Sequence, residues 1–284
     1  MREKIMELRI TLPMTLDEYE IGYPFTLIQA YKKETGGGEG VTIVKNEPFD
    51  NFPLFGGKYT KGQYTYKIFN IESKLPAFVR LVAPENSTVG HEEAWNAYPY
   101  SKTIYSNPGY MKGDFYMVVE SFHIEEDRGQ TENIFELNKE DLNKRDVIHI
   151  DIADPVDEKD YIKEYDPTTF KSKETGRGPL SEDWIKTAKP VMTAYKLVRV
   201  HTNGALFQMI APKVEEYIKK VQQRFMMNFY REMFCSIDKW YNVTMEEIRA
   251  MENEVKNILD EQRDKGEVKS YGGLLHLMMQ TQNV

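Results

Sequence analysis

A long amphipathic helix near the C-terminal end of the sequence is the feature that most restricts how this chain can fold. Between Pro212 and Trp240, apolar residues recur every three or four positions, which is the spacing that places them on one face of an α-helix. They are Val214, Tyr217, Ile218, Val221, Phe225, Phe229, Met233 or Phe234, and Ile237. We expect Pro212 near the first turn, where a proline removes no helical hydrogen bond. The apolar face needs a partner surface, which the rest of the chain must supply.

Several strands are predicted to supply that surface. Short segments bounded by glycine, proline, asparagine or charged residues have the pattern of strands. Their positions are 7–15, 41–44, 63–71, 77–83, 100–106, 115–124, 147–151 and 194–200. Their succession is typical of antiparallel strands.

A second helix is predicted close to the N-terminal end. The segment from residue 16 to about residue 33 has a helical period, with Tyr19 and Tyr23 on its apolar face. Gly22 and Pro24 interrupt this pattern. We therefore expect a broken or two-part helix.

A third helix and a long surface stretch complete the predicted domain. Thr244 and Glu247 form a capping-box pattern, which opens a helix that ends near Gly266. The charged stretch 154–180 has weak periodicity and is predicted to run over the surface. The elements together predict an α+β fold in which a curved, mostly antiparallel sheet grips a long helix.

Charge and cysteine content restrict the partners and the compartment. The formal net charge of −8 at pH 7 argues against a nucleic-acid partner, because such proteins normally carry a basic face. Cys235 is the only cysteine, which excludes an intramolecular disulfide and indicates a reducing compartment. No apolar run is long enough for a signal peptide or a membrane span. We therefore expect a soluble, cytoplasmic protein.

No motif in the sequence predicts catalysis. The five histidines lie far apart, with no HExxH or other close metal-ligand pair, and no GxSxG motif occurs. The glycine run at 36–40 precedes a strand, whereas a phosphate-binding loop precedes a helix. The sequence does not exclude a hydrolase that uses two paired carboxylates, since a single sequence does not show which carboxylates lie close together in space. We predict no catalytic residue, metal site or cofactor, and we favour a binding or carrier protein.

One strand places a positive charge on an apolar face. Because side chains alternate along a strand, Thr65, Lys67, Phe69 and Ile71 lie on the same face. A lysine in that position either extends to solvent or is held inside by an anionic partner. An internal phosphate would be such a partner.

Seven stretches of the sequence, in this order, resemble the single-domain phosphatidylinositol transfer proteins. They are ETGGGEGV (34–41), KGQYT (61–65), AWNAYPY (94–100), IDIAD (150–154), FKS (170–172), TGRGPL (175–180), and FC with DKW (234–235 and 238–240). The resemblance implies a START-like helix-grip fold over residues 1–269, with a C-terminal tail at 270–284, and long helices that enclose a lipid cavity.

The function that the resemblance implies is transport without covalent chemistry. The domain would enclose one phospholipid molecule, which is phosphatidylinositol or also phosphatidylcholine. It would exchange this lipid between membranes during transient contact with the membrane surface. The protein would act as a monomer and support phosphoinositide kinases by supplying their lipid.

The resemblance also implies which residues bind the lipid. Thr65, Lys67, Asn96 and Glu252 occupy the positions that contact the inositol-phosphate head group. The region of the choline head group is implied to contain Ser101, Thr103, Ser121, Gln222 and Phe229. Lys67 would pair with the phosphate, and the other three offer hydroxyl, amide and carboxylate partners to the inositol hydroxyls.

The membrane-docking segment departs from the family pattern. Residues 201–210 contain no tryptophan pair, and insertion into lipid would instead involve Leu206, Phe207, Met209 and Ile210. The change leaves open a second function, a lipid-sensing adaptor that presents its lipid to phosphoinositide kinases and transfers little.

Three smaller features of the sequence also bear on the resemblance. Ser101 stands where the family often has a reactive cysteine, so sensitivity to thiol reagents should be missing there. Ser172 aligns with a candidate phosphorylation site. The segment 49–61 looks longer than is usual in the family.

Overall fold

One sheet of eight strands forms the centre of the structure. The structure is a computed structural model that describes residues 2–70, 89–109, 115–203 and 205–265. Its strands are β1 (Arg2–Leu12), β2 (Gly40–Phe49), β3 (Gly62–Asn70), β4 (Val89–Ala97), β5 (Tyr100–Ser106), β6 (Phe115–Glu125), β7 (Asp146–Ile150) and β8 (Met192–Thr202). They lie in the order β2-β3-β4-β5-β6-β8-β1-β7. Among the described strands, only β1 and β7 pair in parallel, so the predicted, mostly antiparallel sheet is confirmed.

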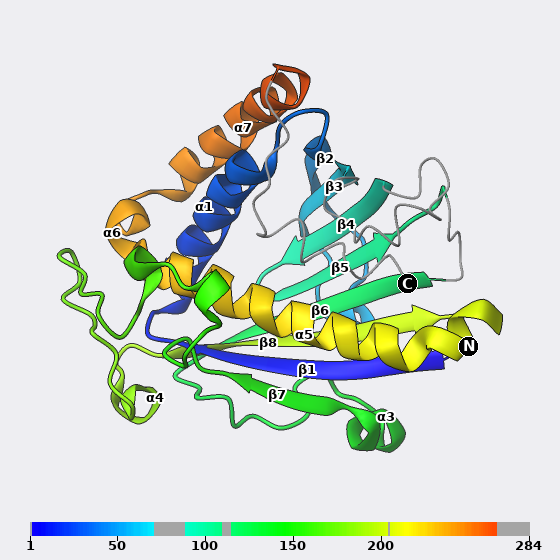
Figure 1. Cartoon of the computed structure of the whole chain (residues 1–284), viewed down its shortest axis with the longest axis horizontal. Coiled ribbons are helices and arrows are strands. Elements are labelled where there is room, and N and C mark those ends of the chain that lie inside the picture. The colour runs from blue at the N-terminus through cyan, green and yellow to red at the C-terminus, as the bar shows by residue number, and fades with distance from the viewer. Residues whose placement is uncertain (1, 71–88, 110–114, 204, 266–284) are drawn as a thin grey trace.

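Three long helices lie on one side of this curved sheet (Figure 1). They are α1 (Leu16–Glu34), α5 (Ala205–Cys235) and α7 (Met245–Lys265). Helix α5 runs along β1 and β8, while α1 and α7 pack side by side and α7 reaches β2 (Figure 1). The shorter helical segments are η1 (Phe55–Gly57), α3 (Lys139–Lys144), η3 (Glu158–Asp160), η4 (Lys163–Tyr165), α4 (Trp184–Thr187) and α6 (Ile237–Trp240). The arrangement is the predicted α+β, START-like fold.

The apolar face predicted for the long helix is buried against the sheet. Ile218, Val221, Phe225, Phe229 and Met233 all belong to the main core, together with residues of β1 and β8. Burial of each such side chain contributes about 1.5–3 kcal/mol. The long helix is therefore held to the sheet by apolar contact.

A second apolar cluster lies on the opposite face of the sheet, under the segment 49–61. The ring of Phe55 lies 4.9 Å from Phe122 and 5.3 Å from Tyr100, measured between ring centroids. Tyr59 stacks on Tyr100 at 5.4 Å. The segment that looked long for the family therefore covers the outside of the sheet with aromatic side chains.

Helix α1 is continuous, so the predicted break is wrong. Its N-terminus is fixed by a capping box, in which the Glu18 amide donates to Thr15 (3.2 Å) and the Thr15 amide donates to Glu18 (2.8 Å). Pro24 lies inside the helix. A Cβ atom at Gly22 would lie 2.9 Å from the ring of Trp240, so the glycine permits close packing of α1 on that ring. Packing here outweighs the low helix propensity of both residues.

The capping box predicted at Thr244 is confirmed, and the limits of the long helix are corrected. The Thr244 amide donates to Glu247 (2.8 Å) and the Glu247 amide donates to Thr244 (3.2 Å), directly before α7. The long helix begins at Ala205, well before Pro212, and ends at Cys235. The four-residue helix α6 then contains Trp240.

Strand β4 was not predicted, because its sequence VGHEEAWNA has charged residues where a strand pattern needs apolar ones. The predicted strand 77–83, the tail 270–284 and the domain limit at residue 269 lie outside the described residues. The strand predicted at 100–106 is β5 with the same bounds, and the other predicted strands are present with shifted ends.

Candidate functional site

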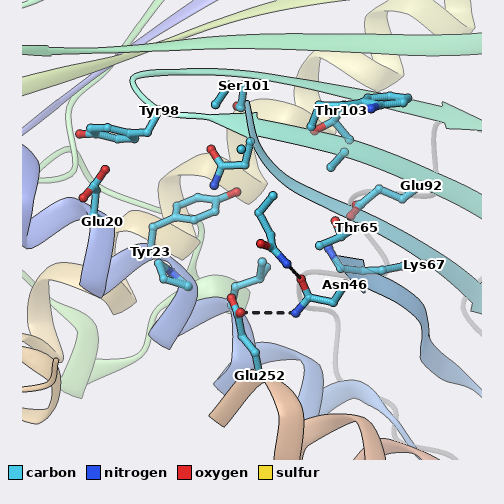
Figure 2. Close-up of a pocket in the computed structure, with 18 of the residues that line it drawn as sticks. Glu20, Tyr23, Asn46, Thr65, Lys67, Glu92, Tyr98, Ser101, Thr103 and Glu252 are labelled. Atoms are coloured by element: carbon cyan, nitrogen blue, oxygen red, sulfur yellow. Dashed lines mark hydrogen bonds and ion pairs between the residues drawn. The ribbon is translucent and has the colours of Figure 1, made fainter. Parts of the chain in front are cut away.

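A cavity of about 440 Å³ lies between the sheet and helices α1 and α7. Its lining comes from α1, from the strands β2 to β6, from β8 and from α7. This volume is within the range of small-molecule binding sites. Figure 2 shows the polar and aromatic side chains that converge on it.

Two walls of the cavity differ in chemistry. The first, which we call the polar wall, consists of Thr65, Lys67, Glu92, Asn96 and Glu252. The second, which we call the aromatic wall, consists of Tyr19, Tyr23, Tyr98 and His123, with Glu20 beside them. Both walls face the same space, so one ligand can contact both.

The four residues that the resemblance assigned to the inositol head group all line this cavity. Thr65 and Lys67 come from β3, Asn96 from β4 and Glu252 from α7. Asn46 on β2 connects the strands to the helix, because its amide lies 3.4 Å from the Glu252 carboxylate (Figure 2). The fold thus brings together side chains that are far apart in the sequence.

Lys67 is held inside by an anionic partner, which is Glu92 on the neighbouring strand. Their charged groups lie 2.6 Å apart, with side-chain exposures of 10% and 4%. The Tyr31 ring lies 5.4 Å from the Lys67 ammonium. Burial by itself lowers the pKa of Lys67, but the Glu92 carboxylate outweighs burial and raises that pKa above its usual value. The pair therefore brings almost no net charge to the polar wall.

Lys196 on β8 is the contrasting cation of the site. It lines the cavity and is buried, and its ammonium lies 3.3 Å from the Ser121 hydroxyl and 5.4 Å from the centre of the Tyr23 ring. No described carboxylate lies within ion-pair distance of it. Burial lowers the pKa of Lys196 from 10.5 to about 8. An anionic ligand would restore the preference for the charged form.

The aromatic wall is a continuous series of rings. Tyr19 lies 5.4 Å from Tyr23 and 4.5 Å from His123, and His123 lies 5.4 Å from Tyr98, between ring centroids. These distances are typical of favourable aromatic pairs. Tyr23 also contacts Phe229 at 5.1 Å, so the wall is anchored to α5.

The histidine of this wall is neutral at physiological pH. Burial, assisted by the nearby charge of Lys196, lowers the pKa of His123 from 6.5 to about 3. Its Nδ1 donates to the Pro99 carbonyl at 3.0 Å, and its Nε2 accepts from the Tyr19 hydroxyl at 3.1 Å. The ring is thereby fixed in one tautomer.

Comparison with known proteins identifies the family. The family model described as phosphatidylinositol transfer protein matches residues 3–257. The phosphatidylinositol transfer protein beta isoform of Rattus norvegicus is 44% identical over 272 residues, which cover 93% of this chain and 96% of the relative. Phosphatidylinositol transfer protein 2 of Dictyostelium discoideum is 42% identical over 254 residues, covering 89% and 93%. The chain belongs to the phosphatidylinositol transfer protein family.

This family is one of lipid transfer proteins and not of enzymes. Among the described residues, no three histidine, cysteine, aspartate or glutamate side chains are grouped as a metal site requires. In the same part of the chain, no helix is long and apolar enough to cross a bilayer.

The five residues assigned to the choline region divide into two groups. Ser101 and Thr103 on β5 line the cavity, and Ser121 lies directly behind it as the partner of Lys196. Gln222 and Phe229 are buried on α5 and do not line the cavity. Phe229 contacts Tyr23 of the aromatic wall.

Ser172 lies in the predicted surface stretch 154–180, but its side chain is buried, with 2% exposed. Its hydroxyl donates to the Asp238 carboxylate, which also accepts from the amides of Lys173 (2.9 Å) and Glu174 (3.2 Å). A phosphate on Ser172 would lie against that carboxylate. Phosphorylation stays a prediction, and it would require this turn to open.

The predicted membrane-docking residues lie in the first turns of α5. Leu206, Phe207, Met209 and Ile210 are thus helical, and their side chains lie outside the described part of the structure. Their role in docking stays a prediction.

Sequence reasoning missed Glu92, Lys196 and the whole aromatic wall. The sequence allowed an anionic partner for a buried Lys67 to be expected. It did not identify Glu92 as that partner, because the strand that contains Glu92 was not predicted. Lys196 lies within a predicted strand, where period two with its apolar neighbours would have placed it on an inward face.

Proposed function

We propose that this chain binds one molecule of phosphatidylinositol in the cavity and exchanges it between membranes. The observation that carries this proposal is the buried ammonium group of Lys196, which has no carboxylate partner among the described residues. A buried cation gains most from an anionic ligand. The phosphodiester of a phospholipid supplies one negative charge, which matches this one uncompensated positive charge.

The phosphate is assigned to Lys196 because Lys67 is already neutralised. The Glu92 carboxylate lies 2.6 Å from Lys67, so a phosphate at Lys67 would meet a buried carboxylate at close range. Repulsion of that kind is strong in a low-dielectric interior. This assignment replaces the expectation from the sequence that Lys67 pairs with the phosphate.

The polar wall is suited to the inositol ring. The carboxylates of Glu92 and Glu252 accept hydrogen bonds, the amide of Asn96 donates and accepts, and the hydroxyl of Thr65 does both. A ring that carries a hydroxyl on almost every carbon matches such a mixture of groups. A head group without hydroxyls would leave these polar groups unmatched, which is the basis of strong discrimination.

Transfer requires no covalent step. A phospholipid leaves a bilayer slowly because its chains become exposed to water at about 0.8 kcal/mol per CH₂ group. A protein that receives the lipid while it touches the membrane replaces this exposure with an apolar interior. Phosphatidylcholine shares the phosphodiester and the chains, and we propose it as a second cargo.

The proposal includes a cytoplasmic monomer that contacts membranes transiently. Docking would involve Leu206, Phe207, Met209 and Ile210. Phosphoinositide kinases would be the consumers of the delivered lipid. In the alternative function, a lipid-sensing adaptor, the protein would bind its lipid in the same cavity but would not exchange it rapidly with membranes.

The test is transfer of labelled phosphatidylinositol and of labelled phosphatidylcholine from donor to acceptor liposomes by the purified protein. Movement of the inositol lipid supports the carrier function. If neither lipid moves although lipid co-purifies with the protein, the carrier function is wrong and the adaptor function takes its place.

A further inference from the structure

We propose that the aromatic wall and Glu20 form a subsite for the quaternary ammonium group of a choline-type head group. The proposal rests on the proposed function, because it concerns a second lipid in the same cavity. It assigns Glu20, Tyr23 and Tyr98 as the residues that decide whether a choline lipid is accepted. These residues differ from the five that the resemblance assigned to the choline region.

The shape of the wall suits a methylated cation. A quaternary ammonium group offers no hydrogen-bond donor, so a protein recognises it with aromatic rings and a nearby negative charge. Tyr23, Tyr19, His123 and Tyr98 form an arc of rings in which neighbouring centroids lie 4.5–5.4 Å apart. Figure 2 shows Tyr23, Tyr98 and Glu20 around one end of the cavity. All four residues line the cavity, so a cation bound at this end would meet aromatic side chains.

The negative charge of the subsite comes from Glu20. This side chain lines the cavity and is half-buried, and it forms no hydrogen bond or ion pair with the described residues. Arg249 is the cation that acts on Glu20, but its guanidinium binds Glu252 at 2.6 Å. Burial and the neighbouring Asp17 raise the pKa of Glu20 above its usual value. A ligand cation would counteract both the burial and the repulsion from Asp17, because it stabilises the charged carboxylate of Glu20.

The remaining groups of the wall do not repel a cation. His123 is neutral, since its pKa is lowered to about 3. Lys196 is the one positive group in contact with the wall among the described residues, at 5.4 Å from the centre of the Tyr23 ring. When Lys196 binds the phosphate, its charge is compensated by the lipid itself. The wall can then accept the positive end of the same head group.

The positions of the two walls explain how one cavity could serve two lipids. Lys196 contacts Tyr23, and Tyr23 also senses the charges of Glu92 and Lys67, so it lies where the walls meet. From a phosphate at Lys196, an inositol ring would extend to the polar wall. A choline group, joined to the phosphate by an ethylene link, would extend to the aromatic wall.

The experiment measures transfer of labelled phosphatidylinositol and labelled phosphatidylcholine by four proteins: wild type, Glu20→Gln, Tyr98→Leu and Glu246→Gln. Glu20→Gln removes the charge with little change in shape, and Tyr98→Leu removes a ring. Glu246→Gln, the control, removes an exposed carboxylate of α7 that does not line the cavity. We expect Glu20→Gln and Tyr98→Leu to lower phosphatidylcholine transfer about tenfold, as loss of a desolvated cation–π or ionic contact does. Phosphatidylinositol transfer should change less than about twofold in all four.

Each other outcome is decisive. Equal losses of both lipids in Glu20→Gln would mean that this residue has only a structural role, and unchanged phosphatidylcholine transfer in Glu20→Gln and Tyr98→Leu would overturn the subsite. If Tyr98→Leu does not fold, as judged by its melting temperature, the result for Glu20→Gln decides. Wild-type protein that moves inositol lipid but no choline lipid would overturn the subsite and leave the proposed function intact. Wild-type protein that moves neither lipid would overturn the proposed function itself.

Discussion

The two walls of the cavity differ in how their charges are balanced. In the polar wall, Lys67 is paired with Glu92 at 2.6 Å, and Glu252 is paired with Arg249 at the same distance. In the aromatic wall, Glu20 has no such partner among the described residues. A ligand therefore meets the polar wall as a set of hydrogen-bonding groups with little net charge, and the aromatic wall as a site with net negative charge.

This difference teaches how one protein can select two head groups. Paired charges recognise neutral polar groups by geometry, because each unmatched hydrogen bond is costly. An unpaired charge recognises an opposite charge with less demand on direction. Lys196 lies between the walls and offers both lipids the same anchor, so substitutions should fall into three classes.

The largest expected effect is that of Lys196→Met, because it removes the shared anchor. A phosphate buried without its cation is strongly disfavoured, and we expect transfer of both lipids to fall about a hundredfold. Methionine has a similar length and keeps the packing. Loading with phospholipid, measured by mass spectrometry of the purified protein, should fall in parallel. Loss of only one lipid would contradict the shared anchor.

The same substitution also provides a pH test on lipid-free protein. Because the pKa of Lys196 is lowered from 10.5 to about 8, the unfolded chain binds more protons than the folded chain between these pH values. The free energy of unfolding should therefore rise with pH across this window, by on the order of 3 kcal/mol. The difference between wild type and Lys196→Met, measured by urea unfolding, isolates this contribution. A constant difference would mean that Lys196 is not buried in the lipid-free state.

The next effect concerns the polar wall alone. The double variant Lys67→Met/Glu92→Gln removes both charges of the pair, and the amide oxygen of the new glutamine would still accept the hydrogen bond of Tyr105. We expect phosphatidylinositol transfer to fall about thirtyfold, because charged partners of the inositol hydroxyls are lost. Phosphatidylcholine transfer should change less than about twofold.

The single variant Lys67→Met serves as the control for stability. It leaves Glu92 buried without its partner, which should lower the free energy of unfolding by about 3 kcal/mol, whereas the double variant should stay near wild type. Parallel losses of both lipids in the double variant would show that the walls do not act separately.

A smaller effect is expected for Glu252→Gln. The amide keeps the shape but weakens hydrogen bonds to a hydroxyl-bearing ring, so inositol-lipid transfer should fall about fivefold to tenfold. Choline-lipid transfer should stay within about twofold. Glu246→Gln, which changes an exposed carboxylate on the same helix, is the matched control. If it has the same effect, the loss reflects the charge of α7 and not the cavity.

Sequence reasoning reached the polar wall but not the aromatic wall, and the reason is physical. Lys67 and Thr65 were assigned to the same face because period two is a local property of a strand, and the resemblance assigned them, with Asn96 and Glu252, to the head group. Tyr23 and Tyr98 belong to a helix and to the turn before β5. Their rings meet only through packing of α1 against the sheet, which no local pattern reports.

The outline of the fold was predicted because it depends on local sequence patterns. The capping box at Thr244 and the apolar face of α5 are local signals, and both are confirmed. The errors arose where distant contacts decide: Pro24 is tolerated inside α1, and the charged strand β4 is held by pairing on both sides. Glu92, which neutralises Lys67, lies in that strand and was missed with it.

The smallest expected effect is that of a thiol reagent on the native protein. Cys235 is the only cysteine; it is buried, and burial raises its pKa to about 12, so little reactive thiolate forms. Treatment with N-ethylmaleimide should change the transfer of either lipid by less than about twofold. Ser101 lines the cavity (Figure 2), and Ser101→Cys should make transfer of both lipids sensitive to the reagent. Protection of that thiol by bound phospholipid would place the head group between the two walls, whereas modification at an equal rate with and without lipid would mean that the cavity is not where the lipid binds.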